Sequence, residues 1–226
     1  MSGCGYLVDR AETLRYLGYA GQAIDESLTG RLDEVAETVQ RTASPGYRYR
    51  IFPLEEVEGG MHLVGTTLVL PGDDIGKHLS GAREAALMAC TLGLSNEREG
   101  RRMRLVNPLD AFMFDAAGSA LVESVADACN AAIVREAHER GLYCNWRYGP
   151  GYGDLPLDVQ PSIVRILGAE KSLGLTVTAS NLLVPAKSST AVIGLFDTPQ
   201  DDKRSCANCS FRPYCSIRKD GTTCYR

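Results

Sequence analysis

The sequence has few of the features that mark several common classes of protein. Its 226 residues include one tryptophan and three histidines, and no stretch reaches the ~20 apolar residues that a membrane-spanning helix needs. The first ten residues lack the basic and then apolar order of a secretory signal. The net charge is only −4, which argues against a protein built mainly to hold nucleic acid. We therefore expect a soluble cytoplasmic protein without a membrane or nucleic-acid partner.

What the sequence does contain is typical of a globular protein. Hydrophobic residues make up 44% and charged residues 23% of the chain, which are ordinary values. A chain of this length buries roughly 70% of the surface that it exposes when unfolded, so it has enough residues for a substantial core.

Cysteine is unevenly distributed along the chain. Half of the eight cysteines lie within the last 21 residues, namely Cys206, Cys209, Cys215 and Cys224. Disulfides are one interpretation, but clustered cysteines in a reducing compartment more often bind a metal. The C-x-x-C spacing at the start brings two thiolates to one centre, and the later pair completes a four-thiolate site. The sequence predicts either a zinc ion or an iron–sulfur cluster at these four residues.

Charge divides the chain at the same place. From Lys203 onward there are six basic residues and one acidic residue, whereas the preceding residues include 18 basic and 27 acidic ones. A polar run with Pro199 separates the two parts. We expect a body of residues 1–198 and a small cysteine-rich tail of residues 199–226.

Hydrophobic periodicity predicts four helices. Apolar residues at a spacing of three to four indicate a helix over residues 24–43, and small apolar residues indicate one long helix over about 108–140, closed by Gly141. Shorter helices are expected from Asp73 to near Gly81 and over residues 157–167.

Alternating or continuous apolar runs predict the strands. They are expected over residues 47–54, 61–70, 85–94, 142–147, 175–178 and 190–195, with an acidic turn at Glu55 and Glu56 and a charged, solvent-facing segment over residues 96–104. Helices and strands do not alternate regularly. The predicted fold class is α+β, a mixed or antiparallel twisted sheet with flanking helices.

A glycine-rich loop, residues 146–157, carries the clearest chemistry. Three glycines and two prolines among its twelve residues specify an irregular backbone whose amides are available to a ligand. Arg147 offers a planar donor fork for a carboxylate, and Tyr148 and Tyr152 offer flat faces. The glycine spacing does not match the G-x-G-x-x-G dinucleotide pattern. Two interpretations stay open, a site for a small molecule with a carboxylate and an aromatic ring, and a rigid turn.

Residues 147–152 read Arg-Tyr-Gly-Pro-Gly-Tyr, which resembles the Arg-x-x-Pro-Gly-Tyr segment in the activation domain of cobalamin-dependent methionine synthase. Residues 175–191, with Val-Pro-Ala-Lys-Ser before a predicted strand, are similar to a later stretch of that family. The early Arg-Tyr-Leu-Gly-Tyr at residues 15–19 resembles short, free-standing members. The resemblance is strongest over residues 105–196.

The resemblance implies an S-adenosylmethionine site. In the family's pattern Arg147 would meet the methionyl carboxylate, the backbones of Gly149 and Gly151 would approach the ligand, and Tyr152 would line the pocket. Glu123 resembles a helix acid that is a candidate partner for the ligand's amino group. The alternative for Glu123 is an ordinary solvated helix carboxylate, and Asp127 shares its face one turn later.

The sequence also departs from the family. Residues 178–180 read Thr-Ala-Ser where the family usually has an acid, and the Asp-x-His-x-x-Gly cobalamin-ligand signature is absent from the sequence. The substrate, folate and cobalamin modules do not fit within 226 residues. The chain alone is therefore not expected to be a methionine synthase, and we assign no catalytic side chain.

The resemblance implies a free-standing protein of methionine biosynthesis that supports reductive reactivation, or remethylation, of a cobalamin or corrinoid methyltransferase lacking its own activation domain. Cobalamin would come only through that partner, and a flavodoxin- or ferredoxin-type protein would donate the electron. Because reactivation needs an electron, a four-iron four-sulfur cluster is favoured over zinc in the tail. Two alternatives are an S-adenosylmethionine-sensing regulatory protein with a structural zinc tail, and an iron–sulfur electron carrier whose loop is only structural.

Overall fold

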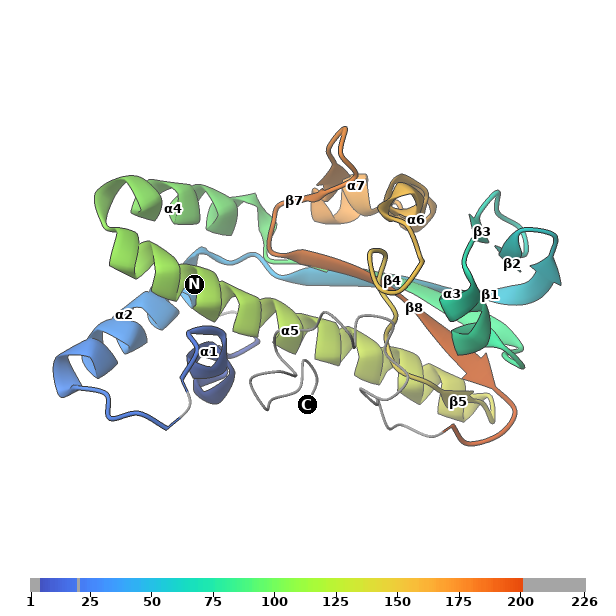
Figure 1. Cartoon of the computed structure of the whole chain (residues 1–226), viewed down its shortest axis with the longest axis horizontal. Coiled ribbons are helices and arrows are strands. Elements are labelled where there is room, and N and C mark those ends of the chain that lie inside the picture. The colour runs from blue at the N-terminus through green and yellow to red at the C-terminus, as the bar shows by residue number, and fades with distance from the viewer. Residues whose placement is uncertain (1–4, 20, 201–226) are drawn as a thin grey trace. The chain divides into compact units, whose positions relative to one another are not determined.

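The structure is a computed structural model that describes residues 5–19 and 21–200 (Figure 1). The chain divides into two compact units. Among the described residues, the first unit comprises residues 5–19, 21–50, 88–133 and 160–190, and the second comprises residues 51–87, 134–159 and 191–200. The four cysteines expected to hold a metal lie outside the described residues, so the tail and its boundary stay predictions.

The first unit is mainly helical. It contains α1 (Arg10–Tyr16), α2 (Glu26–Thr42), α4 (Gly93–Val106), α6 (Gln160–Leu167), α7 (Ala169–Leu173), most of α5 (Pro108–Glu139) and the short antiparallel pair β6 (Thr176–Val177) and β7 (Leu183–Val184). In α2 the side chain of Asp25 accepts a hydrogen bond from the Ser27 amide at the helix start, and Leu32, Val35 and Val39 form the buried face. The helix predicted over residues 24–43 is confirmed.

The long helix predicted over residues 108–140 is also confirmed. The 32-residue helix α5 ends two residues before Gly141, which takes a left-handed φ of 72°. Its buried side chains are mostly small, with Ala117 and Ala120 fully buried, so that neighbouring elements approach closely. By length and composition α5 would be able to cross a membrane, yet 56% of its most apolar window is buried within the protein, as is common for a core helix.

The six-stranded sheet has the order β3-β2-β1-β4-β8-β5, and every strand contributes to the second unit. The strands are β1 (Gly46–Val57), β2 (Gly60–Leu63), β3 (Val69–Leu70), β4 (Glu84–Thr91), β5 (Tyr143–Cys144) and β8 (Ser188–Phe196). The pairs β1·β2, β2·β3 and β5·β8 are antiparallel. The second unit also contains helix α3 (Asp73–Leu79), the 3-10 helix η1 (Leu157–Val159) and the end of α5. The predicted α+β class is confirmed.

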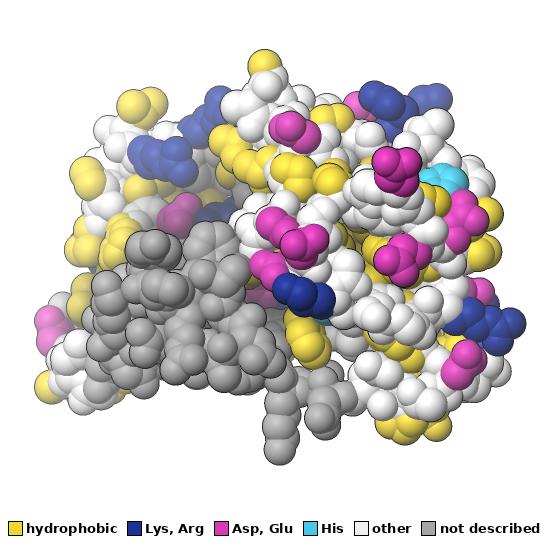
Figure 2. All heavy atoms as spheres, turned by 45° about the vertical axis from the view of Figure 1, so that its right-hand side comes forward, with side chains coloured by type: hydrophobic (Ala, Val, Ile, Leu, Met, Phe, Trp, Pro, Cys, Tyr) yellow, Lys and Arg dark blue, Asp and Glu magenta, His cyan; other side chains and the backbone are white. Residues whose placement is uncertain are grey.

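The central strands β4 and β8 are buried along most of their length. The surface carries the charges, and on the face in Figure 2 carboxylates stand out at several separate places. This distribution agrees with the surplus of acidic residues before Lys203.

One predicted turn and one predicted strand were wrong. Strand β1 continues to Val57, so Glu55 and Glu56 are strand residues, because they pair across the ladder with His62 and Met61. The single strand expected over residues 61–70 is instead β2 and β3. A turn at Gly65, with φ of 83°, separates the two strands, and the Leu63 amide donates to the Leu68 carbonyl across it.

Other local predictions were incomplete. The charged segment over residues 96–104 belongs to helix α4, and α1 and α7 were not foreseen. The strand expected over residues 142–147 is reduced to β5 plus a single bridge between Tyr148 and Val192. The helix expected over residues 157–167 begins as the 3-10 helix η1.

Candidate functional site

The glycine-rich loop lies in the second unit, between β5 and α6, and a buried asparagine holds its start. Asn145 is 6% exposed. Its side-chain amide donates to the carbonyl of His78 at 2.7 Å, and its Oδ1 accepts from the Gly194 amide at 2.7 Å. The Asn145 amide also donates to the Gly194 carbonyl. The loop therefore leaves the sheet from a point tied to both α3 and β8.

A second anchor, formed by backbone groups, follows three residues after Asn145. The Tyr148 amide donates to the Val192 carbonyl at 2.9 Å, and the Val192 amide donates back to Tyr148 at 2.8 Å. Arg147, which is half-buried, stands between this bridge and Asn145. Its backbone is therefore held on both sides, and this position is set by the sheet rather than by the loop.

The glycines form a compact turn beyond that bridge. The Tyr152 amide donates to the Gly149 carbonyl at 3.1 Å, and the Gly151 amide donates to the Leu155 carbonyl at 2.8 Å. Gly151 has a φ of 90°, and Leu155 is fully buried beneath the turn. The side chain of Tyr152 remains 62% exposed, so its ring is accessible at the surface.

Aromatic rings pack along the loop. The ring of His78 lies 5.0 Å from that of Trp146 and 4.9 Å from that of Tyr148, measured between centroids. Tyr148 in turn lies 6.4 Å from Tyr152 in an edge-to-face arrangement. His78 is 9% exposed, so the row of rings runs from a buried histidine to an exposed tyrosine.

The far side of the loop is fastened to α3. The carboxylate of Asp154 accepts hydrogen bonds from the amides of Asp73, at 2.5 Å, and of Asp74, at 3.1 Å. A Cβ on Gly153 would lie 2.1 Å from the Tyr148 hydroxyl and 2.6 Å from Oδ2 of Asp74. Only glycine fits there, since Gly153 also has a positive φ of 52°.

The structure thus places four of the predicted ligand residues, Arg147, Gly149, Gly151 and Tyr152, on one anchored loop. Glu123 lies in the part of α5 that belongs to the first unit and is half-buried. Burial raises the pKa of Tyr16, and the negative charge of Glu123 adds to that effect. Tyr16 belongs to the early segment, residues 15–19, that contributed to the family resemblance.

Metal ligands were predicted only in the tail, at Cys206, Cys209, Cys215 and Cys224, which lie outside the described residues. Over residues 5–19 and 21–200, no group of three or more His, Cys, Asp or Glu side chains is placed to hold a metal ion.

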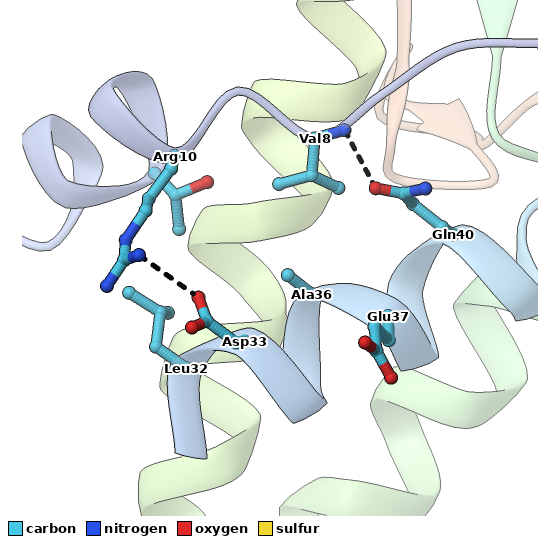
Figure 3. A pocket seen from close by; sticks show the side chains of 8 residues that line it. Val8, Arg10, Leu32, Asp33, Ala36, Glu37 and Gln40 are labelled. Carbon is cyan, nitrogen blue, oxygen red and sulfur yellow. Dashed lines mark hydrogen bonds and ion pairs between the residues drawn. The ribbon is translucent and has the colours of Figure 1, made fainter. Parts of the chain in front are cut away.

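The first unit contains a separate cavity of ≈ 190 Å³ between the chain start and α2 (Figure 3). The Val8 amide donates to Oε1 of Gln40 at one end, and Arg10 lies 3.7 Å from Asp33 at the other. Arg10 and Asp33 form an ion pair at the cavity wall and no other described residue there points to a ligand, so we assign the cavity none.

The fold has a counterpart among solved structures. The chain is similar to a crystal structure described as the MetH reactivation domain bound to AdoHcy, with a TM-score of 0.62 and 16% sequence identity. The match covers 93% of this chain and 80% of that one. The chain matches no protein-family model, and no curated protein matches it in sequence. At this identity the likeness shows a common fold.

Proposed function

We propose that the chain binds S-adenosylmethionine at the glycine-rich loop and supports reductive remethylation of a cobalamin-dependent methyltransferase. The observation that carries the proposal is the fold shared with a reactivation domain whose crystal structure contains AdoHcy. AdoHcy is what remains of S-adenosylmethionine after its methyl group has been transferred. The motif at residues 147–152 supplies the independent support from the sequence.

The donor set of the loop suits the ligand. The guanidinium of Arg147 offers two parallel N–H donors to the methionyl carboxylate, a geometry that a lysine does not provide. The anchors at Asn145 and Tyr148 hold the backbone on both sides of Arg147, so little backbone entropy is lost when the ligand binds.

The remaining loop residues shape the site. Gly149 and Gly151 have no Cβ, so the backbone is able to approach the ligand closely. The exposed ring of Tyr152 provides a flat surface for an aromatic base. The role of Glu123 as a partner for the ligand's ammonium group stays a prediction from the family resemblance.

In this proposal the chain acts by positioning S-adenosylmethionine for transfer of its methyl group. S-adenosylmethionine supplies an electrophilic methyl group, and the cobalt that accepts it belongs to the partner. Arg147 and the loop backbone orient the ligand, and no side chain of this protein needs to transfer a proton. The protein is thus an accessory component rather than a complete methyltransferase.

The tail would supply the electron path. Cys206, Cys209, Cys215 and Cys224 are four soft ligands, and the basic residues around them offset the negative charge of a four-thiolate centre. We propose a four-iron four-sulfur cluster that accepts an electron from a flavodoxin- or ferredoxin-type donor. A zinc ion held by the same thiolates is the alternative and would favour the S-adenosylmethionine-sensing function.

Calorimetric titration of the purified chain with S-adenosylmethionine tests the binding site. We expect Arg147→Ala to weaken binding by about tenfold or more, because a charge-assisted hydrogen bond contributes roughly 1.5–3 kcal/mol. Arg83→Ala is the matched control, since Arg83 is an exposed arginine of the same unit that lies 3.6 Å from Asp197. Equal affinities of the wild type and a folded Arg147→Ala variant would remove Arg147 from the site.

Reactivation itself requires a second assay. The return of the methylcobalt absorbance of an oxidised corrinoid methyltransferase is followed under anaerobic conditions. We expect it to need this protein, S-adenosylmethionine and a low-potential reductant together. Steady consumption of S-adenosylmethionine by the chain alone would contradict the proposed function.

A further inference from the structure

Figure 1 shows the junction in the first unit where α4 ends and α5 begins. Exposed apolar side chains lie at this junction. Leu105 is 89% exposed, Val106 70%, Leu109 45% and Phe112 57%. We call these four residues the α4–α5 corner. Large apolar side chains scattered singly over a surface are ordinary, but these four are concentrated within eight residues at one helix junction, and such concentrations mark interaction sites.

The corner is held in one conformation. The Asn107 amide donates to the Met103 carbonyl and ends α4. The Oδ1 of Asn107 accepts from the amides of Leu109, at 3.1 Å, and Asp110, at 3.3 Å, and so caps α5. Pro108 follows the cap at the first helical position, which its ring favours. The apolar side chains are therefore presented on a fixed backbone, and docking a partner costs little backbone entropy.

The rim of the corner is positive. Helix α4 has four arginines and two glutamates. Glu97 pairs with Arg101 at 2.9 Å and Glu99 with Arg102 at 2.6 Å, so the charges of Arg98 and Arg104 remain as the surplus of the helix.

Neighbouring elements preserve this positive rim. Asp110, at the start of α5, forms an ion pair with Arg31 of α2, which neutralises its charge. The hydrogen bond from Arg102 and the charge of Arg41 both hold the pKa of Glu99 below its usual value, so Glu99 is an anion whose charge is offset by two arginines. The rim thus contrasts with the acidic balance of the residues that precede Lys203.

We infer that the α4–α5 corner docks a protein partner whose surface combines an apolar depression with surrounding carboxylates. Resting on the proposed function, this partner is the corrinoid methyltransferase. The proposed function calls for a protein partner. An anionic membrane would also attract the arginine rim, so vesicle binding is one outcome that the test distinguishes. A second copy placed corner to corner is disfavoured because the two arginine rims would repel each other.

The test measures binding of the full chain to a purified, cobalamin-loaded methionine synthase that lacks a reactivation domain, by sedimentation velocity. We expect the double variant Leu105→Ser, Phe112→Ser to bind at least about tenfold more weakly, as truncation of buried interface anchors does. Leu182→Ser is the control, because Leu182 is 55% exposed in the same unit but distant in sequence from the corner. It should bind like the wild type.

A second experiment tests whether the positive charge of the rim contributes to binding. Reversal by Arg98→Glu with Arg104→Glu should weaken the complex and reduce its dependence on salt concentration. All three variants are surface changes, and circular dichroism and thermal unfolding verify that each is folded.

Several results would overturn the inference. One is that the double corner variant binds the partner as tightly as the wild type does, and another is that the wild type forms no complex at all. The inference would also fail if the corner residues were needed for binding to phosphatidylcholine–phosphatidylserine vesicles in place of the protein, or for dimerisation of this chain. Calorimetry with S-adenosylmethionine separates this failure from that of the proposed function. If the corner variant still binds S-adenosylmethionine and supports reactivation like the wild type, only the proposed docking surface is wrong.

Discussion

Asn145 joins three segments of the second unit through one buried side chain. Its amide and carbonyl groups hold the end of α3 and strand β8, and its own chain continues directly into the glycine-rich loop. The position of Arg147, two residues later, therefore depends on hydrogen bonds that Asn145 makes to distant parts of the chain.

We predict that Asn145→Ala lowers the free energy of unfolding by about 2–4 kcal/mol, because it leaves the His78 carbonyl and the Gly194 amide buried without these partners. Urea unfolding measures this loss, and calorimetry should show weaker S-adenosylmethionine binding. Asn130→Ala is the control. Its Oδ1 accepts no hydrogen bond within the described part of the chain, and alanine favours the helix. Equal stabilities of the two variants would contradict the role of Asn145.

His62 is the residue from which a pH dependence follows. Its Nδ1 lies 2.6 Å from Oε1 of Glu55, and its Nε2 lies 2.9 Å from the Thr66 carbonyl oxygen. Both partners are acceptors, so only the protonated ring donates to both. The hydrogen bond to Glu55, which faces His62 across β1 and β2, is the main cause of the raised pKa of His62.

Since the pKa is raised in the folded state, the stabilisation is fully present below the unfolded value of about 6.5 and is lost as pH rises through the folded value. We predict that the stability difference between the wild type and His62→Gln is largest near pH 6 and shrinks by about pH 8.5. Urea unfolding across this range measures it. Glu55→Gln should lower the pKa of His62 in an NMR titration. A stability difference that stays constant with pH would refute the assignment.

At the scale of elements, α3 is capped by a residue that is distant in sequence. Its own N-cap residue, Gly72, has no side chain, and the carboxylate of Asp154 takes that role for the amides of Asp73 and Asp74. A Cβ at position 72 would lie 2.4 Å from Oδ1 of Asp154. The glycine at 72 and the aspartate at 154 therefore fit as a pair, and α3 and the loop are positioned together.

We predict that Asp154→Ala costs about 1 kcal/mol of stability, as the loss of an N-cap does, whereas Asp154→Asn keeps an acceptor and most of the stability. Hydrogen exchange of the α3 amides should accelerate in Asp154→Ala before other helices are affected. If the amides of α3 exchange at the wild-type rate, the cap is not what holds the helix.

Elements with a clear local signal could be predicted from the sequence. The apolar stripe of α2, the small buried side chains of α5 and the uninterrupted apolar run of β4 each indicate the observed element. Helix α4 was missed although its Glu97–Arg101 and Glu99–Arg102 spacings are those of helical ion pairs, because the charges were interpreted only as solvent-facing. The hairpin of β2 and β3 was missed because apolar residues continue up to the turn.

The loop that carries the candidate site was predictable from the sequence only in its contiguous part. The motif placed Arg147, Gly149, Gly151 and Tyr152 on one loop. Its supports come from elsewhere, since Asn145 bonds to residues 67 and 49 positions away and Asp154 bonds to an amide 80 positions away. His78 is likewise distant in sequence from Trp146 and Tyr148, although its ring packs against theirs. Such contacts depend on the folded topology and leave no local pattern in the sequence.

At the scale of the whole molecule, charge and cysteine content separate the tail from the body. The described core reaches Phe196, which is 4% exposed at the end of β8, and the four clustered cysteines all follow Lys203. Metal binding and ligand binding are therefore expected to be separable by cutting the chain.

We predict that truncation after Thr198 abolishes bound metal but leaves a body that unfolds cooperatively and binds S-adenosylmethionine with the affinity of the full chain. The physical reason is that the thiolates are removed while β8 and the glycine-rich loop are retained. Elemental analysis and visible absorption of protein purified anaerobically distinguish the metal centres, because an iron–sulfur cluster is coloured and zinc is not. Cys209→Ser in the full chain should lose the metal, and Cys144→Ser, outside the tail, should keep it. Metal retained by the truncated chain would move the site into the body, and loss of cooperative unfolding would make the tail part of the core.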